Sequence, residues 1–183
     1  DGPAVLMLHG SGAGASSLGN FRKVLQPLAD AGLHVFAMDL IGFGRSGRKS
    51  APPYFDYGLW LAQCRQMLQR LPGRQVGVIG HSLSGSLALR LAASEPRVGR
   101  VMTTASLGAP FQANATTLAT WTCPRNREQL LAAAQRLIAD PALIDEAYLT
   151  HRAQQLFAGD YAEHYEAMFA GDRQRFIDIA TLA

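Results

Sequence analysis

The sequence predicts an α/β fold in which short buried strands alternate with helices. Apolar runs that predict buried strands occur at residues 4–8, 34–38, 75–79 and 98–105. Amphipathic stretches that predict helices stand between them, at residues 20–31, 57–71 and 83–93. Because strands and helices alternate along the chain, we expect parallel βαβ units that share one sheet.

The segment that carries most information places Ser82 between a predicted strand and a predicted helix. A tight turn there would expose the Ser82 hydroxyl and put the backbone N–H groups of the helix start beside it. Such a turn needs small neighbours. Gly80 satisfies this need, and so does Ser84, a small residue that stands where the usual motif has glycine. The pattern predicts a nucleophilic serine, although an ordinary strand-to-helix turn is an open alternative at this point.

A glycine-rich loop, residues 9–16, follows the first predicted strand. Its backbone N–H groups could stabilise an oxyanion, and we expect the N–H groups of Ser11 and Leu83 to form the pair of donors. A phosphate-binding loop is the alternative, but the segment lacks both the Lys-Ser/Thr of a P-loop and the third glycine of a dinucleotide-binding motif. The order of strand, His-Gly loop, helix, strand, Asp39 and serine turn predicts the α/β-hydrolase fold. Asp39 is an acid at the end of a predicted strand, and a catalytic role is one alternative, but we favour the interpretation that Asp39 fixes the following loop by side-chain hydrogen bonds.

Composition excludes several other classes of protein. The chain has 183 residues, of which 48% are hydrophobic, and its net charge of +3 comes from scattered arginines rather than a dense basic block. We therefore expect neither a nucleic-acid partner nor a membrane partner. Cys64 and Cys123 lack the spacing of a metal site and predict buried thiols of a cytoplasmic protein. We expect no metal, no cofactor, no membrane span and no signal peptide.

The pattern changes after residue 110. Residues 1–110 predict a partial α/β-hydrolase core with a mostly parallel sheet, whereas residues 111–183 carry helical patterns alone. Asn126 and Gln129 predict the capped start of a helix that ends near Ala139, and Asp145 predicts the cap of a longer helix. A helical block at this place in the chain predicts a cap or lid.

Several of these segments resemble the meta-cleavage-product hydrolases, which break carbon–carbon bonds in bacterial aromatic degradation. The resemblance is carried by residues 6–15, 20–22, 31–35 and 39–46, and by residues 140–144 with the arginine that follows at position 152. Family members usually have asparagine before the serine, where this chain has His81.

The resemblance implies a small-molecule substrate of the 2-hydroxy-6-oxo-hexa-2,4-dienoate type. Such a substrate is ketonised, water or the serine attacks its 6-keto carbon, and the C5–C6 bond breaks. It further implies that Ser82 is the catalytic serine, that Arg152 binds the substrate carboxylate and that Asn20 holds the dienol oxygen, while Gly10 and His81 line the substrate site. The residues alone leave alternatives open: Arg152 could be an exposed helix arginine that interacts with Glu146 or lies over apolar surface, and Asn20 could be a plain helix cap.

A general base for the serine is not evident. The histidines that follow Ser82 are His151 and His164, both in predicted helices, and no acidic residue closes the strand that ends at residue 105. We therefore expect an internal fragment of a longer hydrolase, inactive alone and capable of forming a homo-oligomer when whole. A generic esterase, or a non-catalytic binding protein built on the same fold, is the alternative.

Overall fold

The computed structural model describes residues 2–182, and within them four parallel strands form one sheet in the order β2-β1-β3-β4. The strands are β1 (Ala4–Leu8), β2 (His34–Met38), β3 (Val76–His81) and β4 (Val98–Thr104). In the register of the sheet, Leu6 lies opposite Phe36 on one side and Val78 on the other. All five residues of β1 are buried, as expected for a central strand that is covered on both faces.

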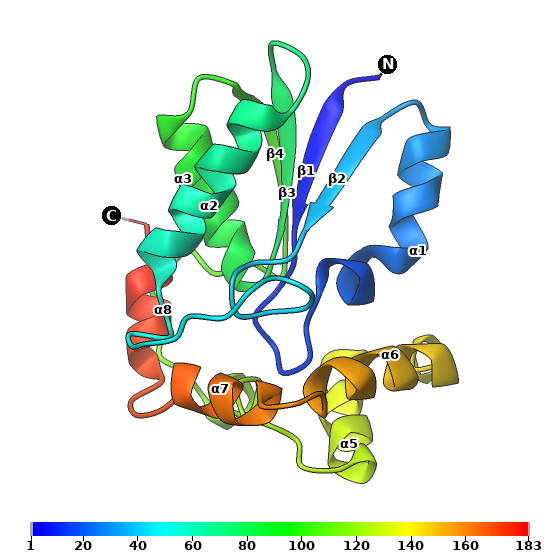
Figure 1. The fold of residues 1–183 in the computed structure, drawn as a ribbon, viewed down its shortest axis with the longest axis vertical. Coiled ribbons are helices and arrows are strands. Elements are labelled where there is room, and N and C mark those ends of the chain that lie inside the picture. The colour runs from blue at the N-terminus through cyan, green and yellow to red at the C-terminus, as the bar shows by residue number, and fades with distance from the viewer. Residues whose placement is uncertain (1, 183) are drawn as a thin grey trace.

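Helices cover both faces of the sheet (Figure 1). Helix α1 (Ser17–Asp30) lies on one face, where its Phe21 packs against Val5 and Met7. Helices α2 (Tyr57–Arg70) and α3 (Leu83–Ser94) lie on the opposite face, over Leu6 and Leu8. Alternate residues of one strand thus serve two cores, and the predicted α/β-hydrolase fold class is confirmed.

Helix α1 begins earlier than the sequence predicts. Its N-cap is Ser16, whose Oγ accepts a hydrogen bond from the Gly19 N–H at 3.0 Å. Asn20 therefore stands inside the first turns of the helix, and the interpretation of Asn20 as a helix cap is wrong. The reason is local, because a serine followed by residues that tolerate a helix supplies a cap one turn before the asparagine.

The described part of the segment after β4 contains short helices joined by loops and no strand. It holds α4 (Ala115–Ala119), α5 (Arg127–Leu137), the 3₁₀ helix η1 (Pro141–Leu143), α6 (Glu146–Leu156), α7 (Tyr161–Met168) and α8 (Gln174–Ala180). The predicted cap of α5 is confirmed, because Asn126 Oδ1 accepts from the Gln129 N–H at 2.9 Å. Figure 1 shows α5, α6 and α7 in a layer beyond the carboxyl ends of the strands, whereas α8 returns to the core beside α3. Arg90 of α3 donates a hydrogen bond to the Thr181 carbonyl at 2.6 Å, which links the end of α8 to α3.

Both cysteines are free and buried. Burial raises the pKa of Cys64 to about 12 and the pKa of Cys123 to about 11, so neither thiol ionises near neutral pH. Among residues 2–182, no helix is both long enough and apolar enough to cross a membrane.

Candidate active site

Ser82 occupies the junction between β3 and α3 in a left-handed backbone conformation, with φ 56° and ψ −125°. A positive φ is strained for a residue with a side chain, typically by about 1–3 kcal/mol, and persists only where surrounding bonds hold it. Those bonds are present. The Ser82 N–H donates to the Thr104 carbonyl at 2.9 Å, and the Ser82 carbonyl accepts from the N–H groups of Gly85 and Leu107. Within residues 2–182, the Ser82 side chain makes no capping hydrogen bond to α3.

Small residues let α3 approach β3 closely at this turn. A Cβ at Gly80 would lie 2.3 Å from the Ser84 carbonyl oxygen, and a Cβ at Gly85 would lie 2.0 Å from Ser106 Oγ. Ser84, which replaces the usual glycine, is fully buried, and its Oγ donates to the His9 carbonyl at 2.5 Å. The extra hydroxyl therefore ties the serine turn to the His-Gly loop instead of pushing the two apart.

The orientation of the His-Gly loop is set by His9, which is fully buried. Its Nε2 accepts from the Leu40 N–H at 3.0 Å, so the ring proton lies on Nδ1, which donates to the Gly10 carbonyl at 2.7 Å. Burial is the largest influence on His9 and lowers its pKa, which keeps the ring neutral. Because C=O and N–H point in opposite directions across a planar trans peptide, the Ser11 N–H points away from His9.

Gly10 brings this loop against the serine turn. A Cβ at Gly10 would lie 3.0 Å from Ser82 Cβ and 2.9 Å from His81 Cδ2, so any larger residue would separate the two segments. Within the described residues, neither the Ser11 N–H nor the Leu83 N–H donates to a protein acceptor. Both predicted oxyanion donors are therefore available, and their role stays a prediction.

A cavity of about 800 Å³ lies beside Ser82. Residues of the sequence-predicted site share its wall, namely Gly10, Ser11, Asn20, His81, Ser82 and Arg152. The apolar part of the wall comes from residues that include Phe21, Val24, Ile79, Met102 and Leu137. Leu83 is the exception among the predicted residues, because its side chain is fully buried and only its backbone could act in the site.

Asn20 presents an unpaired acceptor to this cavity. Its Oδ1 is buried and has no hydrogen-bond partner among residues 2–182. Leaving a buried polar atom unpaired typically costs about 1–3 kcal/mol, and a hydroxyl of a bound molecule would remove that cost. His81, in contrast, is already engaged, since its Nδ1 lies 3.0 Å from Thr104 Oγ1. Burial above all lowers the pKa of His81, so its ring is neutral at pH 7.

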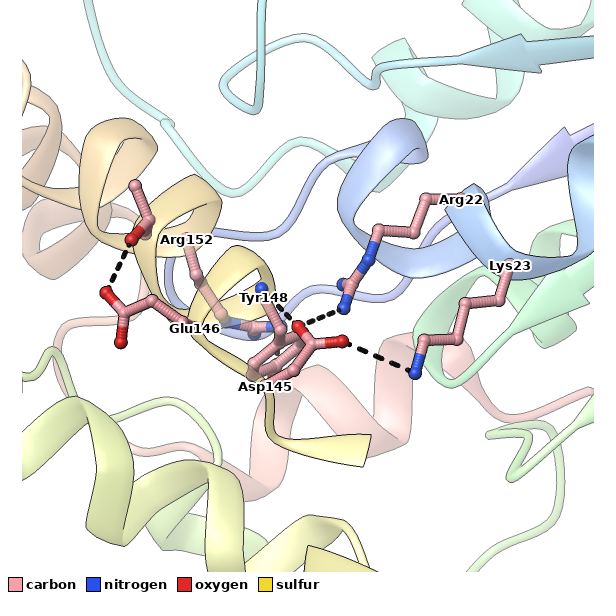
Figure 2. Close-up of polar contacts among 7 residues, drawn as sticks. Arg22, Lys23, Asp145, Glu146, Tyr148 and Arg152 are labelled. Atoms are coloured by element: carbon pink, nitrogen blue, oxygen red, sulfur yellow. Dashed lines mark hydrogen bonds and ion pairs between the residues drawn. The ribbon is translucent and has the colours of Figure 1, made fainter. Parts of the chain in front are cut away.

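Arg152 projects from α6 toward the His-Gly loop (Figure 2). Its Nε donates to the Ala13 carbonyl at 2.9 Å, and its Nη1 donates to the Tyr148 hydroxyl at 3.0 Å. The alternative of an ion pair with Glu146 is wrong, because Glu146 pairs with Arg127 instead. No carboxylate in the described part of the chain pairs with Arg152, so its charge is available to an anion in the cavity.

Asp39 has the structural role that the sequence suggested. Its Oδ1 accepts from the Ser17 N–H at 2.6 Å, and its Oδ2 accepts from the Arg45 N–H at 2.8 Å. Burial acts to raise the pKa of Asp39, but these hydrogen bonds outweigh burial and lower it. Asp39 thus joins the start of α1 to the loop after β2.

No histidine in the described residues bonds to the Ser82 hydroxyl. His151 Nε2 lies 2.9 Å from Ser16 Oγ, at the start of α1. His164 Nε2 is buried and has no hydrogen-bond partner in the described part of the chain, and its ring packs edge-on against Tyr54. The structure therefore identifies no base for Ser82 between residues 2 and 182.

Three aromatic residues beyond β4 contact the His-Gly loop, and sequence reasoning missed all of them. Trp121 Nε1 donates to Ser11 Oγ at 2.9 Å, and the Tyr165 hydroxyl donates to the Ser11 carbonyl at 3.0 Å. The Tyr161 hydroxyl accepts from the Gly14 N–H at 3.3 Å. The one available signal was the spacing of Tyr161 and Tyr165, which places both on one face of α7.

Comparisons with known proteins show the family and the fold of this chain. Residues 3–164 match the family model described as alpha/beta hydrolase fold. A 2-hydroxymuconate semialdehyde hydrolase of Pseudomonas sp. (strain CF600) is 30% identical over 95% of this chain and 61% of its own length. A 2-hydroxy-6-oxo-2,4-heptadienoate hydrolase of Pseudomonas putida is 28% identical over 97% of this chain and 64% of its own length. The chain thus spans less than two thirds of these curated relatives.

A solved structure is similar over the whole chain. The 2-hydroxy-6-oxo-6-phenylhexa-2,4-dienoate hydrolase of Rhodococcus sp. strain RHA1 superimposes with a TM-score of 0.83 and 25% identity. The match covers 100% of this chain and 67% of that one.

Proposed function

Because this chain belongs to the α/β-hydrolase fold family, we propose that its whole protein hydrolyses a carbon–carbon bond in a 2-hydroxy-6-oxo-hexa-2,4-dienoate, with Ser82 as the catalytic serine. The observation that carries the proposal is one cavity lined by both Ser82, in its strained backbone conformation, and Arg152, which pairs with no carboxylate among residues 2–182. A serine turn alone does not distinguish this substrate from an ordinary ester. A half-buried cation in the wall of the same cavity favours a substrate that carries a carboxylate.

The carboxylate of the dienoate would bind Arg152, whose guanidinium is already oriented by Ala13 and Tyr148. Burying that carboxylate unpaired would be unfavourable by several kcal/mol, so the pairing fixes which end of the substrate faces α6. Asn20 Oδ1 would accept a hydrogen bond from the dienol hydroxyl at C2. Moving that hydroxyl proton to C5 gives the 2,6-diketone, in which C6 is an ordinary electrophilic ketone.

Cleavage follows from addition to that ketone. Water, or Ser82 Oγ, adds to C6, and the carbonyl oxygen becomes an oxyanion that the N–H groups of Ser11 and Leu83 would stabilise. Each donor of this kind typically contributes about 10²–10³ in rate. The C5–C6 bond then breaks, and its electron pair moves into the conjugated keto acid. Protonation of the resulting dienolate gives 2-hydroxypentadienoate. If water was the nucleophile, C6 leaves directly as a carboxylic acid. If Ser82 was the nucleophile, C6 remains as an ester on Ser82, and a water molecule hydrolyses that ester to the carboxylic acid and restores the Ser82 hydroxyl.

The mechanism needs a general base that removes a proton from water or from Ser82. His9, His81 and His151 each bond another group, and we do not assign any of them this role. The curated relatives are longer than this chain, and we place the base and its partner acid in the additional length of the whole protein.

We further propose that residues 111–183 form the cap, with α8 as its return to the core at residues 1–110. The two buried free thiols suit a reducing compartment, and on that basis we propose a cytoplasmic enzyme. Assembly of the whole protein into a homo-oligomer stays a prediction.

A comparison of two substrates tests the proposal. The whole protein would be incubated with a coloured 6-phenyl-2-hydroxy-6-oxo-dienoate and with p-nitrophenyl acetate, and products would be identified by mass spectrometry. We expect benzoate and 2-hydroxypentadienoate, with kcat/KM for the dienoate at least about 100-fold above that for the ester, because the ester cannot use Arg152 or Asn20. Turnover of the ester alone would establish a generic esterase. Turnover of neither, together with binding of the dienoate, would establish a binding protein.

A further inference from the structure

We propose that Trp121 is a positioning residue for the oxyanion donor, acting through the side chain of Ser11. The inference rests on the proposed function, since it assigns a role to a donor of that mechanism. Ser11 stands between Gly10 and Gly12, and glycine leaves a backbone freer than any other residue does. A donor on such a segment needs external bonds that fix its direction.

Those bonds reach Ser11 from two parts of the molecule. On the core side, His9 holds the Gly10 carbonyl, which belongs to the same peptide unit as the Ser11 N–H. On the other side, the Tyr165 hydroxyl holds the Ser11 carbonyl and the Trp121 indole N–H holds Ser11 Oγ. Every polar group of Ser11 except its N–H therefore has a partner, and the N–H is the group that the oxyanion would use.

Trp121 is itself held rigidly. It is 4% exposed, its ring stacks on Phe169 with centroids 5.7 Å apart, and Phe176 meets it edge-on at 5.6 Å. These aromatic contacts fix the indole plane, and the plane fixes the direction of the N–H that reaches Ser11. The packing of helices beyond β4 thereby sets the geometry of a loop that follows β1.

The kinetic consequence is specific. A misdirected Ser11 N–H would weaken an interaction that forms fully only in the transition state, so kcat would fall while KM stayed constant. Trp121→Phe keeps the aromatic stacking and removes the indole N–H. We expect it to lower kcat about tenfold, less than the roughly 10²–10³ typical of losing a whole donor, because the backbone N–H remains.

Trp60 offers a matched control. It is 1% exposed, packs against Phe43 and Phe55, and its Nε1 donates to the Ile41 carbonyl at 2.8 Å. Trp60→Phe thus removes the same kind of bond from a tryptophan of similar burial, but from a loop that supplies no oxyanion donor. We expect Trp60→Phe to leave kcat within about twofold of wild type, because the lost hydrogen bond does not orient any group that acts in the transition state.

The experiment measures kcat and KM on the dienoate and on p-nitrophenyl acetate for the whole protein with Trp121→Phe, Trp60→Phe, Ser11→Ala, and the double variant of Trp121 and Ser11. Both substrates form an oxyanion, so Trp121→Phe should lower kcat on both. Ser11→Ala should give a similar loss, and the double variant no further loss, because Trp121 acts through Ser11 Oγ.

An unchanged kcat for Trp121→Phe, a change in KM alone, or losses that multiply in the double variant would overturn the inference. Should Trp121→Phe fail to fold, an unchanged kcat for Ser11→Ala would overturn it as well. Failure of the proposed function would give a different result, because the wild-type protein itself would then not turn over the dienoate.

Discussion

Arg152→Gln separates two interactions that one guanidinium makes. Its Nε holds the Ala13 carbonyl of the His-Gly loop, and its charge faces the cavity where the substrate carboxylate would bind. Glutamine keeps a polar side chain of moderate length but cannot pair with a carboxylate as a cation. The first interaction affects every substrate, whereas the second affects only substrates that carry the carboxylate.

The two magnitudes can be estimated separately. The hydrogen bond from the charged guanidinium to the Ala13 carbonyl is worth about 1.5–3 kcal/mol, so kcat/KM for an ester should fall by at most about 12- to 160-fold. The charge-assisted pair with a carboxylate is worth about 1.5–3 kcal/mol more, a further factor of about 12 to 160 that applies only to the dienoate.

The assay compares kcat/KM on both substrates in the whole protein. Arg22→Gln is the matched control, because Arg22 also lies over the Tyr148 ring (Figure 2) but pairs with Asp145 at 2.8 Å instead of lining the cavity. We expect Arg22→Gln to change neither substrate by more than about threefold, in line with the small worth of an exposed ion pair. Equal losses on ester and dienoate for Arg152→Gln would refute the carboxylate role and leave Arg152 as a structural residue of the loop.

Two further predictions concern stability, measured as the free energy of unfolding in urea. Gly80→Ala should destabilise the protein by about 1–3 kcal/mol or more, because its Cβ would meet the Ser84 carbonyl at 2.3 Å, whereas Gly77→Ala in the same strand meets Val5 at an ordinary 3.4 Å and should change stability by less than about 1 kcal/mol. Equal effects of the two substitutions would contradict the close approach of α3. Burial lowers the pKa of His9 and of His81 in the folded protein. Below pH about 6.5 these two histidines therefore bind more protons in the unfolded chain than in the folded one. Stability should therefore fall between pH 7.5 and 5.5, by at most about 1.4 kcal/mol per pH unit for each histidine, and equal or greater stability at pH 5.5 would contradict the neutral, buried rings.

The serine turn could be predicted from sequence because its signals are local. An apolar run, a small residue on each side and an amphipathic stretch fall within a dozen residues of Ser82, and the turn needs no distant partner to be recognised. Helix starts were harder. Ser16 and Asn20 are both residue types that cap helices. In the folded chain Ser16 caps α1 and Asn20 lines the cavity, and this difference depends on tertiary structure.

Contacts between distant segments were beyond sequence reasoning. Trp121 and Ser11 are 110 residues apart, and no periodicity connects an indole to a loop hydroxyl. The short helices α4 and α8, of five and seven residues, were also missed. Two turns or fewer give a helical period too little length to be seen, and such helices form because tertiary packing supports them.

The turnover of a dienoate by the whole protein with Ser82→Ala tests the central claim most directly. Ser86→Ala is the matched control, since Ser86 is buried in the same helix and bonds the Tyr57 hydroxyl at 2.8 Å, away from the cavity. We predict that Ser82→Ala lowers kcat by at least about 10³-fold with its fold intact, while Ser86→Ala retains kcat within about tenfold. Retention of activity within tenfold by Ser82→Ala would contradict the assignment of Ser82 as the catalytic serine.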